Sequence, residues 1–130
     1  MMSPDKIASV LKVVTVEDSL VVARRLESML FEVTNLEFLG NAPGIPEALT
    51  LIDSKRPDVT ILDLHLGGDA NGMDLLPVLR RLYPQMKIII LTNLAYPHYQ
   101  RTCLSLGADY FFDKSNDFDK VPEVLKSFQL

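Results

Sequence analysis

The stretch "PDVTILDL" (57–64) is apolar on both of its alternating faces, with Val59, Ile61 and Leu62 at its centre. A strand at the surface of an antiparallel sheet alternates apolar and polar residues, whereas a parallel strand that helices cover on both faces is apolar throughout. The stretch therefore predicts a buried strand of a parallel sheet. Near its carboxyl end the apolar run gives way to a carboxylate, Asp63.

The segments on either side of this stretch alternate in the same way between short apolar strands and amphipathic helices. Four more strands are predicted, over 12–18, 36–42, 86–93 and 108–114. Helical spacing of apolar residues, together with Pro, Asn and Gly at helix ends, predicts the helices, which cover 19–33, a segment from Pro46, 73–82, a segment from Pro97 to Gly107, and one from Asn116 through Phe128. Five strand–helix units in succession predict an α/β domain with a parallel sheet and helices on both faces.

The composition is that of one ordinary globular domain of 130 residues, 48% hydrophobic and 23% charged. A net charge of −4 argues against a nucleic-acid groove and a polybasic membrane patch, because both need a positive field. The single cysteine, Cys103, excludes an internal disulfide and a CxxC zinc site. No run resembles a signal peptide or reaches the roughly 18 apolar residues of a membrane span, so we expect a cytoplasmic protein.

Five polar side chains follow apolar runs at the carboxyl ends of the predicted strands: Glu17, Asp18, Asp63, Thr92 and Lys114. Parallel strands bring these ends to the same edge of the sheet, where ligands of α/β folds bind. Three carboxylates placed together repel one another, and a cation that prefers oxygen ligands, such as Mg²⁺, removes that conflict. A lysine and a threonine suit phosphoryl oxygens, and Asp63 is the best candidate for a nucleophile that forms an acyl phosphate.

With these strand ends the chain resembles the receiver domain of two-component response regulators. The resemblance covers about residues 11 to 128 and depends on four motifs, "VEDS" (16–19), "PDVTILDLHL" (57–66), "ILT" (90–92) and "GADYFFDK" (107–114). It implies a flavodoxin-like (βα)5 fold, a doubly wound sheet of five parallel strands in the order 2-1-3-4-5. It also implies a receiver domain over residues 11–130, preceded by a short N-terminal extension over residues 1–10.

The resemblance implies a metal site and a site of phosphorylation among these residues. Asp63 would be the phosphorylated aspartate. Asp18 would bind Mg²⁺ directly, Glu17 would bind it through a water molecule, and Asp63 and the backbone carbonyl of His65 would be further ligands. Mn²⁺ is the alternative ion.

The resemblance implies a switch as well. Lys114 would contact the phosphoryl group, Thr92 would hydrogen-bond to it and move toward it, and Phe111 would change rotamer into the space that Thr92 leaves. A phosphoryl group adds about −1.5 to −2 charges and three acceptor oxygens. These movements would repack the face formed by the fourth helix, the fifth strand and the fifth helix, which a partner would read.

Three features depart from the family pattern. Gly67 stands where the family has a proline, and the loop from it to Gly72 is one residue longer than usual. Ser115 follows Lys114 in place of a frequent cis proline, so this peptide bond is either trans or a costly cis bond. Asn93 stands where a small residue is usual, and we expect it to restrict access to the phosphoryl group, whose lifetime Asn93→Ala should then change.

Three functions compete for these residues. A receiver would accept its phosphoryl group from a histidine kinase or a histidine phosphotransfer protein, and it would assist only its own phosphorylation and slow dephosphorylation, unlike a conventional enzyme. A phosphohydrolase of the haloacid dehalogenase kind would need a cap and a second acid two residues after Asp63, where the chain has His65. A flavodoxin-type ligand module would need a phosphate-cradling loop where "EDSLVV" (17–22) stands. The residues favour the receiver.

The output of the receiver is predicted only in outline. The chain starts at Met1 and no effector follows the last predicted helix, so we expect a stand-alone protein that acts on a downstream protein partner. The alternative is a receiver module of a longer transcriptional regulator. A phosphorylation-dependent homodimer is a further expectation, whereas direct contact with nucleic acid and insertion into a membrane are not expected.

Overall fold

The structure is a computed structural model that describes residues 9–129. The strands are β1 (Leu11–Val16), β2 (Leu36–Ala42), β3 (Val59–Leu62), β4 (Lys87–Thr92) and β5 (Tyr110–Asp113). The helices are α1 (Leu20–Phe31), α2 (Ile45–Lys55), the short 3-10 helix η1 (Gly72–Asp74), α3 (Leu75–Leu82), α4 (Pro97–Leu106) and α5 (Lys120–Ser127). This alternation confirms the α/β class. The predicted extension over residues 1–10 lies mostly outside the described residues.

All five strands are parallel and lie in the order β2-β1-β3-β4-β5, as predicted. β3 lies at the centre, between β1 and β4, and each of its residues is buried. The chain passes from β1 to β2 on one side and returns to β3 on the other, so the strand order reverses between β1 and β3. The carboxyl ends of these two strands flank the position where ligands bind in folds of this kind.

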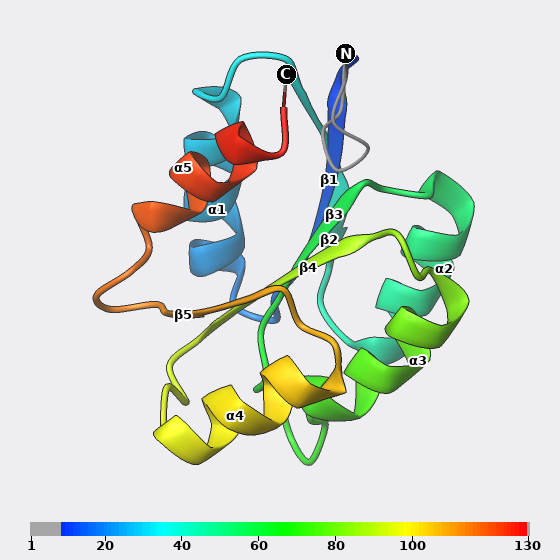
Figure 1. Cartoon of the computed structure of the whole chain (residues 1–130), viewed down its shortest axis with the longest axis vertical. Helices are drawn as coiled ribbons and strands as arrows, with labels where there is room; N and C mark the ends of the chain where they lie inside the picture. Colours follow the sequence, from blue (N-terminus) through cyan, green and yellow to red (C-terminus); the bar gives the residue numbers. More distant parts are fainter. Residues whose placement is uncertain (1–8, 130) are drawn as a thin grey trace.

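Helices cover both faces of the sheet (Figure 1). α1 and α5 lie over Leu11 and Val13 of β1, whereas α2, α3 and α4 lie on the opposite face, over Val14 and Val16. Both layers consist mainly of fully buried leucine, isoleucine and valine, and burial of one such side chain stabilises a fold by about 1.5–3 kcal/mol. The two layers hold the strand ends that carry the polar residues in fixed positions.

Capping side chains, proline and glycine set the helix ends, and both ends of α4 have the predicted cause. The Ser19 hydroxyl accepts a hydrogen bond from the Val22 N–H at 3.4 Å and begins α1. Pro97 is the first residue of α4, where its missing N–H costs nothing. Gly107 ends that helix with a φ of 118°, a left-handed conformation that suits glycine. No helix within residues 9–129 is long and apolar enough to cross a lipid bilayer.

The predicted start of the last helix at Asn116 is wrong, because α5 begins only at Lys120. Residues 113–117 form a tight turn instead, in which the Asp117 N–H donates to the Asp113 carbonyl at 2.8 Å and Asp117 Oδ2 accepts from the Asp113 N–H at 3.1 Å. The Asn116 side chain donates to the Asp113 carboxylate at 2.9 Å and does not cap a helix. Within this segment the peptide bond before Ser115 is trans, the first of the two predicted alternatives.

The third strand and the third helix are shorter than predicted. β3 ends at Leu62, because the Leu64 carbonyl accepts from the Gly72 N–H at 2.6 Å and so belongs to the following loop. The chain then forms η1, which the Asn71 side chain caps by accepting from the Met73 N–H at 2.9 Å. α3 begins after η1 rather than at residue 73, and its proline lies in the first turn, where proline is tolerated. The remaining boundaries differ from the prediction by no more than two residues.

Candidate functional site

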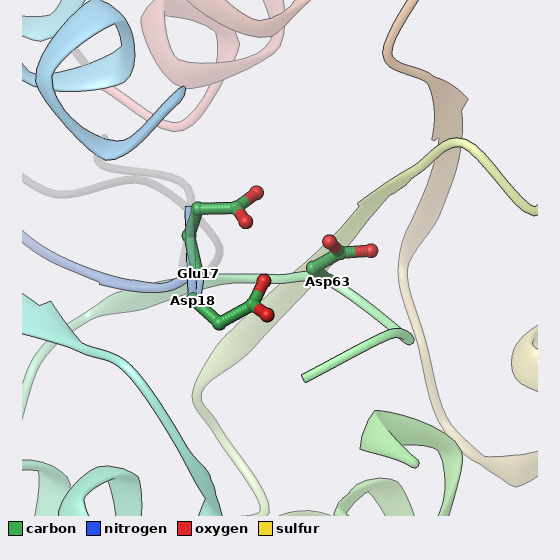
Figure 2. A group of neighbouring side chains, drawn as sticks. All are labelled: Glu17, Asp18 and Asp63. Atoms are coloured by element: carbon green, nitrogen blue, oxygen red, sulfur yellow. The ribbon is translucent and has the colours of Figure 1, made fainter. Parts of the chain in front are cut away.

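Three carboxylates meet at the carboxyl ends of β1 and β3. Glu17 and Asp18 follow β1 directly, and Asp63 follows β3, its N–H donating to the Val16 carbonyl at 3.0 Å. One carboxylate oxygen from each of the three lies within 4.8 Å of the others, and Figure 2 shows the two β1 acids side by side and facing Asp63. Glu17 and Asp63 are 2% and 5% exposed, whereas Asp18 is open to solvent. The expected convergence of the three acids is confirmed.

Lys114 joins two of these acids. β5 lies beside β4, and the Lys114 N–H donates to the Thr92 carbonyl at 3.0 Å, which holds the lysine at the same edge of the sheet. Its ammonium lies 2.6 Å from Asp63 Oδ2 and forms a second ion pair with Glu17 Oε1. The cluster thus holds one ammonium and three carboxylates, and it keeps an excess of negative charge.

The charge states of Glu17 and Lys114 follow from their burial and from each other. Burial raises the pKa of Glu17 above its ordinary value, and the charge of Asp63 also raises it, against the opposing effects of Lys114 and the Ser19 N–H. Burial alone would lower the pKa of Lys114, but its hydrogen bonds to Asp63 and Glu17 outweigh burial and raise that pKa. The lysine therefore stays charged at neutral pH, and a further cation would relieve the carboxylates.

Asn41 positions the acidic pair from the edge strand, and the sequence analysis missed it. The Asn41 amide donates to the Glu17 backbone carbonyl at 3.0 Å and accepts from the buried Thr15 hydroxyl at 2.7 Å. The side chain of Glu17 is held as well, because its carboxylate accepts a hydrogen bond from the Ser19 N–H at 3.0 Å. A polar amide near the carboxyl end of β2, just after Gly40, is the signal that the sequence offers.

The loop after β3 is compact. It begins at Asp63, and its far end at Gly72 packs against the same residue. Asp63 Oδ1 accepts from the N–H of the exposed His65 at 3.3 Å. A Cβ atom at Gly72 would lie 2.2 Å from the Asp63 carbonyl oxygen, so only glycine fits there. A Cβ atom at Gly67, whose φ is 83°, would lie 3.3 Å from Asp18 Oδ2. The tip of the loop, at Gly68 and Asp69, is exposed.

Thr92 and Phe111 lie on the face of the sheet that α2, α3 and α4 cover. Thr92 is fully buried at the end of β4, and its hydroxyl accepts from the Leu94 N–H at 3.1 Å. Phe111 pairs in register with Ile90 and is half-buried on this face, whereas Phe112 packs on the opposite face. Phe111, and not Phe112, is thus the phenylalanine on the face that α2, α3 and α4 cover.

The chain matches known proteins over nearly its whole length. A family model for the response regulator receiver domain matches residues 13–126. The sensory transduction protein LytT of Bacillus cereus is 27% identical over 92% of this chain and 47% of its own length. The protein-glutamate methylesterase/protein-glutamine glutaminase of Clostridium acetobutylicum is 30% identical over 92% of this chain and 32% of its own length. The chain therefore spans about half or less of the length of these relatives.

Solved structures share the fold. The response regulator domain of Thermotoga maritima CheB has a TM-score of 0.79 at 24% identity and covers 92% of this chain and 93% of that chain. A response regulator protein from Burkholderia pseudomallei, solved with a phosphorylated aspartic acid, a calcium ion and citrate, has a TM-score of 0.78 at 26% identity over 88% of this chain and 66% of that chain. Together with the family model, the strand order and the acidic strand ends show that this chain belongs to the receiver domain family of two-component response regulators.

Proposed function

We propose that the chain is a phosphorylation-dependent signalling switch whose Asp63 accepts a phosphoryl group from a histidine kinase or a histidine phosphotransfer protein. One observation carries this proposal. The Lys114 ammonium lies 2.6 Å from Asp63 Oδ2, beside a cluster of three carboxylates. A carboxylate nucleophile with a fixed cation at one oxygen and an oxygen-rich cluster next to it suits phosphoryl transfer, which depends on positioning and charge neutralisation.

The oxygens of Glu17, Asp18 and Asp63 fit a Mg²⁺ ion. Their carboxylates each place an oxygen within 4.8 Å of the others, and hard divalent cations prefer such donors. The backbone carbonyl of His65 is the further ligand that we propose, and Mn²⁺ should substitute. The bound ion supplies positive charge that neutralises the cluster and the incoming phosphoryl oxygens.

The transfer itself needs little from the chain beyond position. An Asp63 carboxylate oxygen attacks the phosphorus of a phosphohistidine, the P–N bond breaks as the new P–O bond forms, and the electron pair leaves with the imidazole, which takes up a proton. Lys114, already at Asp63, then donates to a phosphoryl oxygen and neutralises part of the added charge.

The switch follows from the contacts that the phosphoryl group demands. The Thr92 hydroxyl, which now accepts from the Leu94 N–H, turns to donate to a phosphoryl oxygen. Phe111 is half-buried on the same face of the sheet and fills the space that the threonine leaves. The surface formed by α4, β5 and α5 changes as a result, and we propose that a downstream protein recognises this surface.

We expect the chain to be the substrate of its kinase, with slow loss of its own phosphoryl group, and not an enzyme that acts on free phosphate esters. The residue two positions after Asp63, where a phosphohydrolase needs an acid, is the exposed His65. A separate protein partner is the proposed output, and a domain attached to the same chain is the alternative, since the relatives are about twice as long or longer.

Intact-mass measurement after incubation with Mg²⁺ and acetyl phosphate tests the proposal. We expect the wild type to gain about 80 Da, the mass of one phosphoryl group, and Asp63→Asn to gain nothing. Asp69→Asn is the matched control, because Asp69 is an exposed aspartate of the adjoining loop and should leave the gain intact. A wild type without added mass, or equal labelling of Asp63→Asn, would contradict the proposal.

A further inference from the structure

A cavity of about 270 Å³ lies beside Lys114, between α1 and the loop that joins β5 to α5. Its walls carry a cation, an amide, a hydroxyl and two apolar side chains in addition to this lysine. They are Val22, Arg25, Asn93, Ser115 and Phe118. The cavity therefore gives solvent a polar approach to the ammonium that contacts Asp63.

The Arg25 guanidinium is held at the wall of this cavity by an aromatic ring. Its central carbon lies 4.0 Å from the centroid of the Phe118 ring. Phe118 is itself buried among the apolar residues under α1 and α5. A cation over an aromatic face is attracted by the ring, and within residues 9–129 no ion pair occupies the N–H donors along the edge of the guanidinium.

The two cations of the cavity are engaged to different extents. The Lys114 ammonium is shared between the carboxylates of Glu17 and Asp63. Within residues 9–129, by contrast, the ion pairs leave Arg25 without a carboxylate partner. An anion that approaches through the cavity therefore meets Arg25 as a cation that no acid has neutralised.

We propose that Arg25 determines how well the site accepts anionic phosphodonors, by binding the phosphoryl group of a small acyl phosphate in this cavity before transfer. This inference rests on the proposed phosphorylation of Asp63. In the transfer from acetyl phosphate, the bond between phosphorus and the bridging oxygen breaks, the new P–O bond to Asp63 forms, and the electron pair leaves with acetate. Asn93 and Ser115 line the same cavity and offer hydrogen bonds to the phosphodonor. Asn93 thus lies on the path to Lys114, as expected of a residue that restricts access to the phosphoryl group.

The test is the rate of phosphorylation of the whole chain by acetyl phosphate with Mg²⁺ at low ionic strength, followed by intact mass. We expect Arg25→Gln to lower the apparent second-order rate constant about three- to tenfold, through a higher half-saturating donor concentration and not a lower maximal rate. Arg25→Lys should retain most of the rate. Arg24→Gln is the matched control, because Arg24 is a neighbouring exposed arginine of α1 that does not line the cavity.

Two further readouts separate a charge effect from a structural one. The loss of phosphorylation rate in Arg25→Gln should become smaller at high salt, which screens exposed charges. It should also be smaller with phosphoramidate, a phosphodonor of lower net negative charge. A rate for Arg25→Gln equal to that of the wild type, or an equal loss in Arg24→Gln, would overturn the role of Arg25 alone. A wild type that acetyl phosphate does not label would overturn the proposed function and this inference together.

Discussion

Arg80 near the amino end of the sheet and Lys114 at its carboxyl end are both held by groups from other elements, and the surroundings of these two cations are opposite. Near the amino ends of β4 and β5, the Arg80 guanidinium of α3 donates to three backbone carbonyls and pairs with one carboxylate. Its partners are the carbonyls of Gly107 at 2.6 Å, Met86 at 2.7 Å and Pro84 at 3.0 Å, and the Asp109 side chain at 3.0 Å. The Arg80 cluster therefore holds one basic and one acidic side chain, and its other partners are backbone carbonyls.

At the carboxyl ends, Lys114 faces the three acids of the candidate site, and its charge cannot balance theirs. The same fold thus holds a balanced pair of charges around Arg80 and an excess of negative charge around Lys114. Balance serves stability, because every buried polar group has a partner. Imbalance suits the proposed function, because an excess of negative charge favours the binding of a metal ion. Four substitutions test this difference, in order of the size of the expected effect.

Lys114→Met should have the largest effect. It leaves the buried Glu17 and Asp63 carboxylates without their cation, and removal of one partner from a buried ion pair costs about 3 kcal/mol or more. The free energy of unfolding, measured with urea at pH 7, should fall by about this amount. The gap to the wild type should narrow as the pH is lowered, because the carboxylates then take up protons. Lys120→Met, which loses only an exposed ion pair, should change stability by less than about 1 kcal/mol; equal effects of the two substitutions would contradict the buried imbalance.

Arg80→Ala should lower the free energy of unfolding by about 2 kcal/mol, because it leaves several partly buried carbonyls without a donor. The loss should depend little on pH between 5 and 8, unlike that of Lys114→Met, and labelling of Asp63 by acetyl phosphate should persist. Urea unfolding at several pH values measures the first effect and intact mass the second. Arg81→Ala, an exposed neighbour on α3, should leave both unchanged. A strong pH dependence in Arg80→Ala would remove the distinction between the two ends.

Glu17→Gln should weaken Mg²⁺ binding about tenfold, since it removes one of the three negative charges around the ion. In the wild type the pKa of Glu17 is raised by burial, so the folded state holds its proton more tightly than the unfolded state. Stability of the metal-free protein should therefore fall as the pH rises from 4.5 through the raised pKa. Glu17→Gln should lose this part of the pH dependence. Thermal melts at several pH values, with and without MgCl₂, measure both effects, and an unchanged pH profile would argue against the burial effect.

Asn41→Ala should have the smallest effect. It removes the link between Thr15 and the Glu17 carbonyl and should cost about 1 kcal/mol. Because that carbonyl belongs to the peptide bond that joins the two β1 acids, Mg²⁺ affinity should fall slightly as well. Thr15→Val, which removes the other end of the link, should show the same small loss of affinity. Titration with MgCl₂, monitored by the shift in melting temperature, measures both variants, and normal affinity in both would limit Asn41 to a structural role.

The sequence was sufficient to predict the parts of the molecule that repeat a local pattern. Apolar runs indicated the five strands, and the polar residues that follow four of them indicated the site, because a parallel sheet brings all carboxyl ends to one edge. The predicted start of α5 was wrong because Asp113 and Asp117 form hydrogen bonds with each other and make a turn. This turn competes with the helix start, and rules for helix caps do not include such a competition. The contacts of Asn41, Arg25 and Arg80 could not be predicted, because each reaches an element that is distant in the sequence.

Gly72 has a consequence for engineering. Its close approach to the Asp63 carbonyl fixes the far end of the loop beside the residue where the loop begins. The chain therefore returns to the same point whatever path the residues in between take. The exposed tip at Gly68 and Asp69 can then accept foreign residues without moving the carboxylate. A short reporter peptide inserted at this tip would place a label within reach of the chemistry while the scaffold that performs it stays undisturbed.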